Sequence, residues 1–197
     1  MITAPFADAD LRPALRARLL LDHACEPDTI VLDELGLCRG EVRVDMAVVN
    51  GLLHGYEIKS DRDSLRRLGG QSAIYNRVLD RVTLVVGERH LHEALGIVPA
   101  WWGILRIDAS GHEPGFRPLR RGRKNPTLDP RALVELLWLE DAMALLEHHR
   151  IARGMRGKPR RVLWDRLCDH LHADAIAAAV RAGLRARVAR PDHRSPR

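Results

Sequence analysis

The sequence predicts an α/β protein that is followed by an α-helical C-terminal region. Two alternating segments, 41–49 and 52–59, flank Asn50-Gly51, and this dipeptide is typical of a two-residue hairpin turn. The continuous aliphatic run at 82–86 is typical of a buried parallel strand. Segments with helical spacing separate and follow these strands, which is the alternation expected of an α/β domain.

The first part of the chain supplies the expected sheet and the helices that cover it. Leucines at helical spacing predict the opening helix, and helix-start residues after the hairpin predict a second one, kinked or restarted at Gly69-Gly70. The run at 82–86 is expected to close the core sheet before one more strand. In chain order the expected elements are a helix at 10–24, a short apolar segment at 30–37, the hairpin at 41–59, a helix at 65–79, a strand at 82–86, a helix at 88–95 and a strand at 101–107.

The composition changes after residue 108. Residues 110–126 are rich in glycine, proline and cations, so we expect a loop or linker there. Beyond it the spacing predicts only helices, and a basic connector interrupts them. The expected helices lie at 129–149, 162–171 and 173–187, with the connector at 150–161. The chain therefore divides into an α/β core at 1–108, a basic linker or loop at 109–128, and a helical basic region at 129–197 that is a candidate for nucleic-acid binding.

Length and composition set the broad class. A chain of 197 residues can bury a sizeable core. It has no apolar run long enough to span a bilayer, and residues 1–10 lack the basic start and apolar stretch of a secretory signal. Three scattered cysteines form no pair at metal-ligand spacing and suit a reducing compartment. We therefore expect a cytoplasmic protein with no membrane segment.

The charge is unevenly distributed along the chain. Residues 1–100 hold 12 Lys/Arg against 15 Asp/Glu, whereas residues 101–197 hold 20 against 11. A basic surface of this kind attracts polyanions in a salt-dependent way. A solvated basic tail is the alternative explanation. A polyanionic partner is thus indicated but not required.

The hairpin carries the most specific pattern. Asp45 lies on its first strand, and Glu57 and Lys59 share one face of the second because strand side chains alternate. Carboxylates on adjacent strands, with the backbone carbonyl of Ile58, could converge on one hard cation, and the lysine could stabilise charge that develops on a phosphate. The alternative is that both acids are ordinary surface residues and Lys59 is their salt-bridge partner.

Joined with its neighbours, this pattern resembles the PD-(D/E)XK nuclease superfamily. The resemblance covers roughly residues 26–107, and the first strand has Val44-Asp45 where the family has Pro-Asp. It rests on Glu34, Asp45, Glu57-Ile58-Lys59 and Gln71-x-x-x-Tyr75, and the segments 40–45 and 54–63 are similar to those of a short bacterial family within that superfamily. It implies a restriction-endonuclease-like three-layer core, a central mixed sheet flanked by helices.

The resemblance also implies roles for individual residues. Asp45 and Glu57 would bind magnesium (Mg²⁺), with Mn²⁺ as a substitute, and Lys59 would assist catalysis. Glu34 would complete the metal environment, with Glu41 as its alternative because it lies on the same strand face as Asp45. Gln71 and Tyr75 would contact substrate. These assignments together describe a metal-dependent nuclease that hydrolyses DNA.

Basic residues of the second half are the candidates for phosphate contacts, which position a nucleic acid without reading its sequence. They are Arg120, Arg121, Arg123, Lys124, Lys158, Arg160 and Arg161. Two alternatives to the nuclease stay open: a catalytically inactive nucleic-acid-binding protein of the same fold, or a non-nuclease interaction module. DNA is the expected partner, and homodimer formation is left open.

Overall fold

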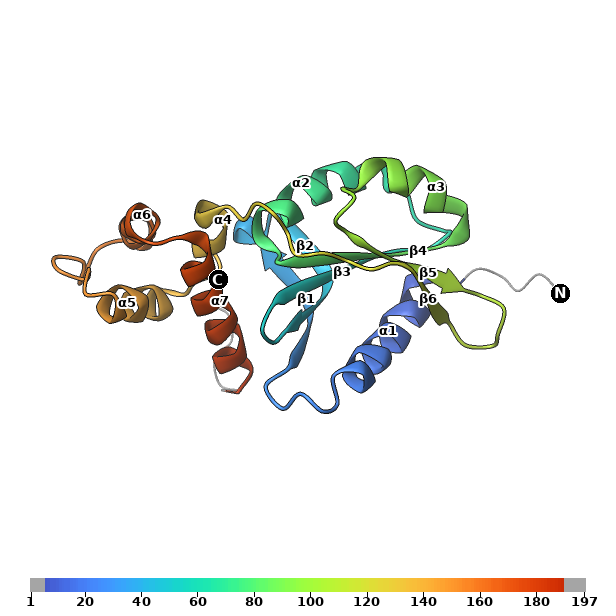
Figure 1. Cartoon of the computed structure of the whole chain (residues 1–197), viewed down its shortest axis with the longest axis horizontal. Helices are drawn as coiled ribbons and strands as arrows, with labels where there is room; N and C mark the ends of the chain where they lie inside the picture. The colour runs from blue at the N-terminus through green and yellow to red at the C-terminus, as the bar shows by residue number, and fades with distance from the viewer. Residues whose placement is uncertain (1–5, 190–197) are drawn as a thin grey trace.

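The computed structural model describes residues 6–189 of the chain. Within this range it contains a six-stranded sheet, seven α-helices and two short 3₁₀ helices (Figure 1). In chain order the elements are α1 (Asp8–Asp22), β1 (Ile30–Leu37), η1 (Cys38–Gly40), β2 (Val42–Val49), β3 (Leu53–Lys59), η2 (Leu65–Arg67), α2 (Leu68–Val78), β4 (Arg81–Val86), α3 (Glu88–Ile97), β5 (Gly103–Asp108), β6 (Gly115–Arg120), α4 (Pro130–Val134), α5 (Leu139–His148), α6 (Arg160–His170) and α7 (Ala173–Val188).

The sheet is mixed, and its strand order follows the chain, β1-β2-β3-β4-β5-β6. Strands β1, β2 and β3 are antiparallel neighbours, β3, β4 and β5 are parallel, and β6 returns antiparallel to β5. The predicted class is therefore confirmed: a mixed α/β fold with helices at its C-terminal end. The core sheet was expected to close with β4, but it continues through β5, which corresponds to the strand expected at 101–107, and through β6, which was not expected.

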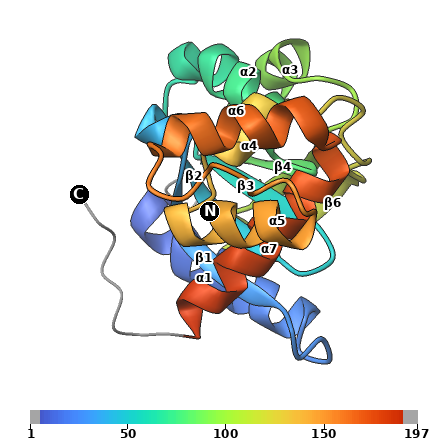
Figure 2. The same cartoon turned by 90° about the vertical axis from the view of Figure 1, so that its left-hand side faces the viewer.

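Helices cover both faces of this sheet (Figure 1). On one face lies α1, whose Leu11, Leu15 and Leu19 are buried at the four-residue spacing of a helix stripe. On the other face lie α2 and α3, above a larger core that continues into the C-terminal helices. Figure 2 shows α5, α6 and α7 gathered at one end of the molecule. The sheet thus separates two environments, one on each face.

One expectation for the segment 109–128 is wrong, because part of it is a strand. Gly115–Arg120 pairs with β5 as the edge strand β6, and most of its side chains are exposed or half-exposed. An edge strand tolerates Pro118 and needs little apolar patterning, so its composition is that of a loop. The chain beyond it is held to the core, since the amides of Arg123 and Asn125 donate to the carbonyls of Trp101 and Asp80 at 2.8 Å.

The helix expected over 129–149 is two helices, α4 and α5. The amides of Leu136 and Leu137 bond to carbonyls three residues back, which tightens and ends α4. Trp138 is then extended, and its amide donates to the Asp141 carboxylate at 3.1 Å, so the next helix begins there. The sequence pattern does not reveal this break, because the helical spacing of apolar residues continues from one helix into the next.

Across residues 6–189 we find no helix with the length and apolar character needed to cross a membrane.

Candidate functional site

Asp45 lies at an irregularity in the sheet. Strands β1 and β2 pair regularly on either side, but Glu34 and Asp45 are left out of the register, and Glu34 has a positive φ of 53°. The Asp45 carboxylate turns toward β3, where its Oδ2 accepts the amide N–H of Ile58 at 2.7 Å. The expected role of Ile58 was a metal contact through its carbonyl, whereas the contact that the structure shows with Asp45 is made by its amide N–H.

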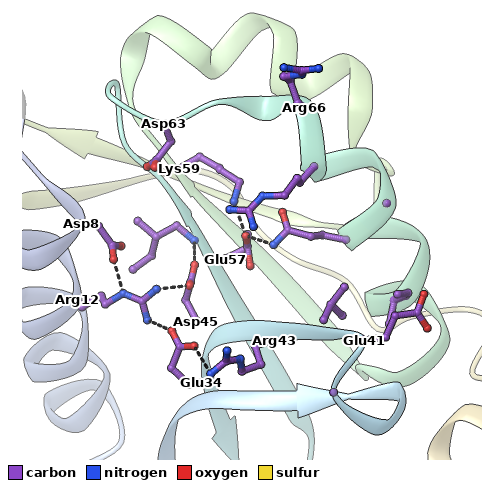
Figure 3. Close-up of a pocket in the computed structure, with 17 residues that line it drawn as sticks. Asp8, Arg12, Glu34, Glu41, Arg43, Asp45, Glu57, Lys59, Asp63 and Arg66 are labelled. Atoms are coloured by element: carbon purple, nitrogen blue, oxygen red, sulfur yellow. Dashed lines mark hydrogen bonds and ion pairs between the residues drawn. The ribbon is translucent and has the colours of Figure 1, made fainter.

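Arg12 of α1 holds three acids at once (Figure 3). Its guanidinium lies 2.5 Å from Asp45 Oδ1, 2.5 Å from Glu34 Oε1 and 2.6 Å from Asp8 Oδ2. Glu34 also pairs with Arg43 at 3.5 Å. A planar guanidinium with several N–H donors suits such a task. Two of the acids that were expected to face a metal ion, Glu34 and Asp45, thus share one cation of the protein.

Glu57 is the most enclosed acid of the site, only 1% exposed. Lys59 Nζ and Gln71 Nε2 donate to its Oε1 at 2.5 and 2.6 Å, and the Tyr75 hydroxyl donates to its Oε2 at 2.6 Å. Gln71 and Tyr75 lie one turn apart on α2, so both reach the same carboxylate. The predicted residues do gather, and three donors satisfy the charge of Glu57.

Apart from the fully buried Tyr75, these residues line one open cavity of about 710 Å³ between α1, the hairpin and α2. Arg43, Arg66 and Arg67 form its exposed rim. Glu41 also lines it, but Figure 3 places this acid on the α2 side, away from Asp45. The cavity therefore alternates acids and bases rather than presenting an acidic face.

The arrangement does not fit a hard cation well. Asp45 and Glu57, the two expected ligands, are occupied by Arg12 and Lys59. Across residues 6–189 no three His, Cys, Asp or Glu side chains are grouped so that they could hold a metal ion. Mg²⁺ prefers a near-octahedral set of oxygen ligands, which two neutralised carboxylates do not supply.

Burial changes the acidity of the site. It raises the pKa of Asp45 from its ordinary value of 3.8 to about 6, and the nearby negative charge of Glu57 adds to this effect. The Ile58 amide and the cations Arg12 and Lys59 act in the opposite direction without cancelling it. Burial likewise raises the pKa of the Tyr75 hydroxyl, and Glu57 adds to the shift. Tyr75 therefore stays protonated and donates to Glu57.

The raised pKa of Asp45 predicts a pH-dependent stability. Because the folded protein binds this proton more tightly than the unfolded chain, the free energy of unfolding falls as pH rises from about 4 to about 6. We expect the parent to lose up to about 3 kcal/mol relative to Asp45→Asn over this window. Urea unfolding of both proteins across the window measures the difference. Asp28→Asn, at an exposed carboxylate outside the cavity, is the charge control; parallel curves for the parent and Asp45→Asn would contradict the prediction.

Sequence reasoning missed Arg12 and Asp8. Two features of the sequence could have indicated Arg12. Asp8 precedes it by one helical turn, and Arg12 is next to Leu11, which lies on the buried side of α1. The signal is weak because the acids that Arg12 neutralises are 22 and 33 residues away in sequence. Only the packing of α1 against the hairpin brings them together.

The basic residues expected to bind phosphate lie outside this cavity, in the two segments 120–124 and 158–161. Arg120 turns inward and donates to the Trp102 and Pro99 carbonyls, and Lys124 pairs with Asp174 at 3.3 Å. The others are exposed to solvent: Arg121, Arg123, Lys158, Arg160 and Arg161. Lys158 lies in the loop between α5 and α6, and Arg160 and Arg161 are the first two residues of α6.

The fold and the site together define an α/β protein whose central acids are held in internal ion pairs. Its family follows from a comparison with known proteins: a model described as "Bacteriophage P4 protein cII" matches residues 7–193, so the chain belongs to that family. Protein cII of Enterobacteria phage P4 is 28% identical over 124 residues, which are 63% of this chain and 47% of that protein. The chain thus spans about half the length of this curated relative.

A protein of unknown function from Silicibacter pomeroyi is a structural neighbour. It is 22% identical, and the match covers 76% of this chain and 92% of that one, with a TM-score of 0.43. A likeness this distant carries no argument about fold or function.

Membership of the cII family corrects the interpretation drawn from the hairpin. The assignment to the PD-(D/E)XK superfamily is wrong, and so are the DNA-hydrolysing activity and the hydrolase class that it implied. The physical reason lies in the pairing of charges: an acid, then Glu-x-Lys, is also the pattern of buried ion pairs. The structure shows the salt bridge between Lys59 and Glu57 that was the alternative explanation, but it buries both side chains instead of leaving them at the surface.

Proposed function

We propose that this chain is a non-enzymatic interaction module whose partner is DNA. The observation that carries the proposal is the connector, residues 150–161, which comprises the loop after α5 and the first two residues of α6. It contains six cations and no acid, and all six side chains are exposed. Phosphate backbones are recognised by exposed cations of this kind, largely without regard to base sequence.

The shape of the connector supports this proposal. Arg150, Gly154 and Gly157 have positive φ angles, so the chain turns repeatedly and projects beyond the helices (Figure 1). Arg150, Arg153 and Arg156 surround a shallow hollow in this projection. Within residues 6–189 one carboxylate pairs with the connector's cations, Glu147 with Arg156 at 3.3 Å. Most of its positive charge is therefore open to a polyanion.

In this proposal the cavity around Asp45 and Glu57 has a structural role and does not bind DNA. Its acids are neutralised by Arg12 and Lys59, so they neither repel a nucleic acid strongly nor need a cation to fold. We assign them to holding α1 and α2 against the hairpin. The binding surface is thus placed on the helical end, and the cavity is a structural centre.

The connector predicts a specific binding defect. Replacing Arg153, Arg156 and Lys158 with serine is expected to weaken binding to a short DNA duplex by about tenfold or more, because phosphate contacts are lost. The slope of log affinity against log salt should fall by roughly one for each contact removed. Fluorescence anisotropy with a labelled duplex, repeated over a salt series, measures both quantities.

A variant of equal charge change controls for bulk electrostatics. Arg62, Arg89 and Arg117 are exposed cations on other elements, and their replacement with serine should leave most of the affinity and the salt slope intact. Equal defects in the two triple variants would contradict a binding site on the connector. The DNA should also be recovered at full length after incubation with MgCl₂, and shortened products would overturn the non-enzymatic assignment.

Binding of Mg²⁺ or Mn²⁺ stays a separate prediction, and it does not depend on cleavage. The ion pairs of Arg12 and Lys59 speak against it at Asp45 and Glu57. A titration of the parent and Arg12→Ala with MgCl₂, followed by calorimetry, tests it directly. A cytoplasmic location and homodimer formation are likewise parts of the proposal, since both suit a DNA-binding module. Sedimentation of the protein with and without duplex tests the homodimer.

A further inference from the structure

A second cavity lies on the face of the sheet that α1 covers, between the C-terminal half of α1 and the edge strand β6. Its volume is about 400 Å³, within the range of roughly 300–1,000 Å³ that small-molecule sites occupy. Elements α1, β3, β4, β5 and β6 all contribute to its wall. It shares no lining residue with the cavity around Glu57, and the connector 150–161 does not contribute to it.

Four arginines line this cavity against a single acid. They are Arg18, Arg81, Arg120 and Arg121, and the acid is Asp22. Arg18 is 3.4 Å from Asp22 and donates to the Phe116 carbonyl, while Arg120 donates only to carbonyls. Within residues 6–189, Arg81, Arg120 and Arg121 have no carboxylate partner. The cavity therefore carries an excess of positive charge.

Arg81 is a cation in the wall of this cavity with no ion-pair partner within residues 6–189. Its Nε is buried and has no hydrogen-bond partner within residues 6–189. A buried donor without an acceptor costs about 1–3 kcal/mol, more when it is charged. Gly122 lets the chain cross close above this side chain, since a Cβ there would lie 3.2 Å from Arg81 Cγ and 3.1 Å from the Gly103 amide nitrogen. The guanidinium is thus held in the wall by packing rather than by an ion pair.

The floor of the cavity is polar and neutral. His54 Nε2 lies 2.8 Å from Thr83 Oγ1, and His54 Nδ1 lies 3.2 Å from the Tyr56 hydroxyl. The two rings stack with centroids 4.3 Å apart. Burial, with Arg81 nearby, lowers the pKa of His54 to about 3, so the imidazole is uncharged. The positive charge of the cavity therefore comes from its arginines, above an aromatic floor.

We propose that this cavity binds a phosphate group, with Arg81 and Arg121 as its main ligands. Guanidinium groups bind phosphate oxygens through paired N–H donors, and one dianion would neutralise the excess positive charge of the cavity. The ligand class is accordingly a phosphate monoester, either a free nucleotide or the 5′ end of a nucleic acid. This site is independent of the connector proposed to hold duplex DNA.

Calorimetry with defined probes tests the proposal. Inorganic phosphate and adenosine monophosphate should bind the parent and raise its melting temperature above that in chloride of equal ionic strength. Arg81→Met and Arg121→Gln should each weaken binding at least fivefold, whereas Arg117→Gln, an exposed arginine on β6 outside the cavity, should leave it unchanged. Arg121 is exposed, so its variant keeps the test valid if Arg81→Met does not fold.

Two oligonucleotides that differ only in their 5′ end separate the sources of phosphate. Preference for the 5′-phosphorylated strand over the 5′-hydroxyl strand supports a nucleic-acid end, and binding of the mononucleotide alone supports a free ligand. No phosphate-dependent effect on the parent, or parental affinity in both Arg81→Met and Arg121→Gln, would overturn the proposal. Because the probes are not duplexes and the variants spare residues 150–161, failure here leaves the DNA proposal untouched.

Discussion

Lys59→Met is expected to lower the free energy of unfolding by about 3–5 kcal/mol, the cost of leaving a buried carboxylate without its cation. Lys59 is 6% exposed and Glu57 1% exposed, and their charged atoms are 2.5 Å apart. The Gln71 amide and the Tyr75 hydroxyl still donate to Glu57 in this variant, but neither supplies a positive charge. Urea unfolding followed by circular dichroism measures the loss.

A second substitution separates the charge from the packing. In Glu57→Gln/Lys59→Met both charges are removed, so the double variant should recover a large part of the stability lost by the single one. Lys158→Met, at an exposed lysine of the connector, is the matched control and should change stability by less than about 0.5 kcal/mol. A loss below about 1 kcal/mol in Lys59→Met would show that water or movement relieves Glu57.

Trp102→Ala is expected to destabilise the protein by about 3–5 kcal/mol, because it removes the largest fully buried side chain and leaves a cavity. Trp102 is 0% exposed, its indole N–H donates to Asn76 Oδ1 at 2.8 Å, and its ring stacks near Tyr75 with centroids 6.0 Å apart. The Asn76 acceptor would also lose its partner. The melting temperature and the urea midpoint should both fall.

The neighbouring tryptophan provides the control. Trp101 is only half-buried and packs at the margin of the same core, so Trp101→Ala should cost clearly less. Similar losses in the two variants would contradict the central position of Trp102. Asn76→Ala removes the acceptor of this hydrogen bond, together with a longer contact of Asn76 Nδ2 with Ser72 Oγ at 3.5 Å, and should cost about 1–3 kcal/mol, chiefly the penalty for an unpaired buried donor.

The sequence predicted most elements because local chemistry decides them. The hairpin follows from Asn50-Gly51 between alternating strands, and β4 follows from a run of buried aliphatic residues. Strand β6 was not predicted because an exposed edge strand needs no apolar alternation. The break between α4 and α5 was not predicted because the helical spacing of apolar residues continues across it. These misses share one cause: the deciding contacts lie in tertiary structure.

The candidate site shows the same division. The sequence alone brought Asp45, Glu57 and Lys59 to one hairpin and placed Gln71 and Tyr75 on the helix that covers it, because strand and helix periodicities dictate those faces. It could not decide what neutralises the acids. Lys59 lies two residues from Glu57 on the same strand face, so strand alternation alone allows this pair, whereas Arg12, 33 residues from Asp45 in sequence, reaches it only after α1 packs on the hairpin. Charge pairing acts through space, so only the tertiary structure decided that Arg12 is the partner of Asp45 and Glu34.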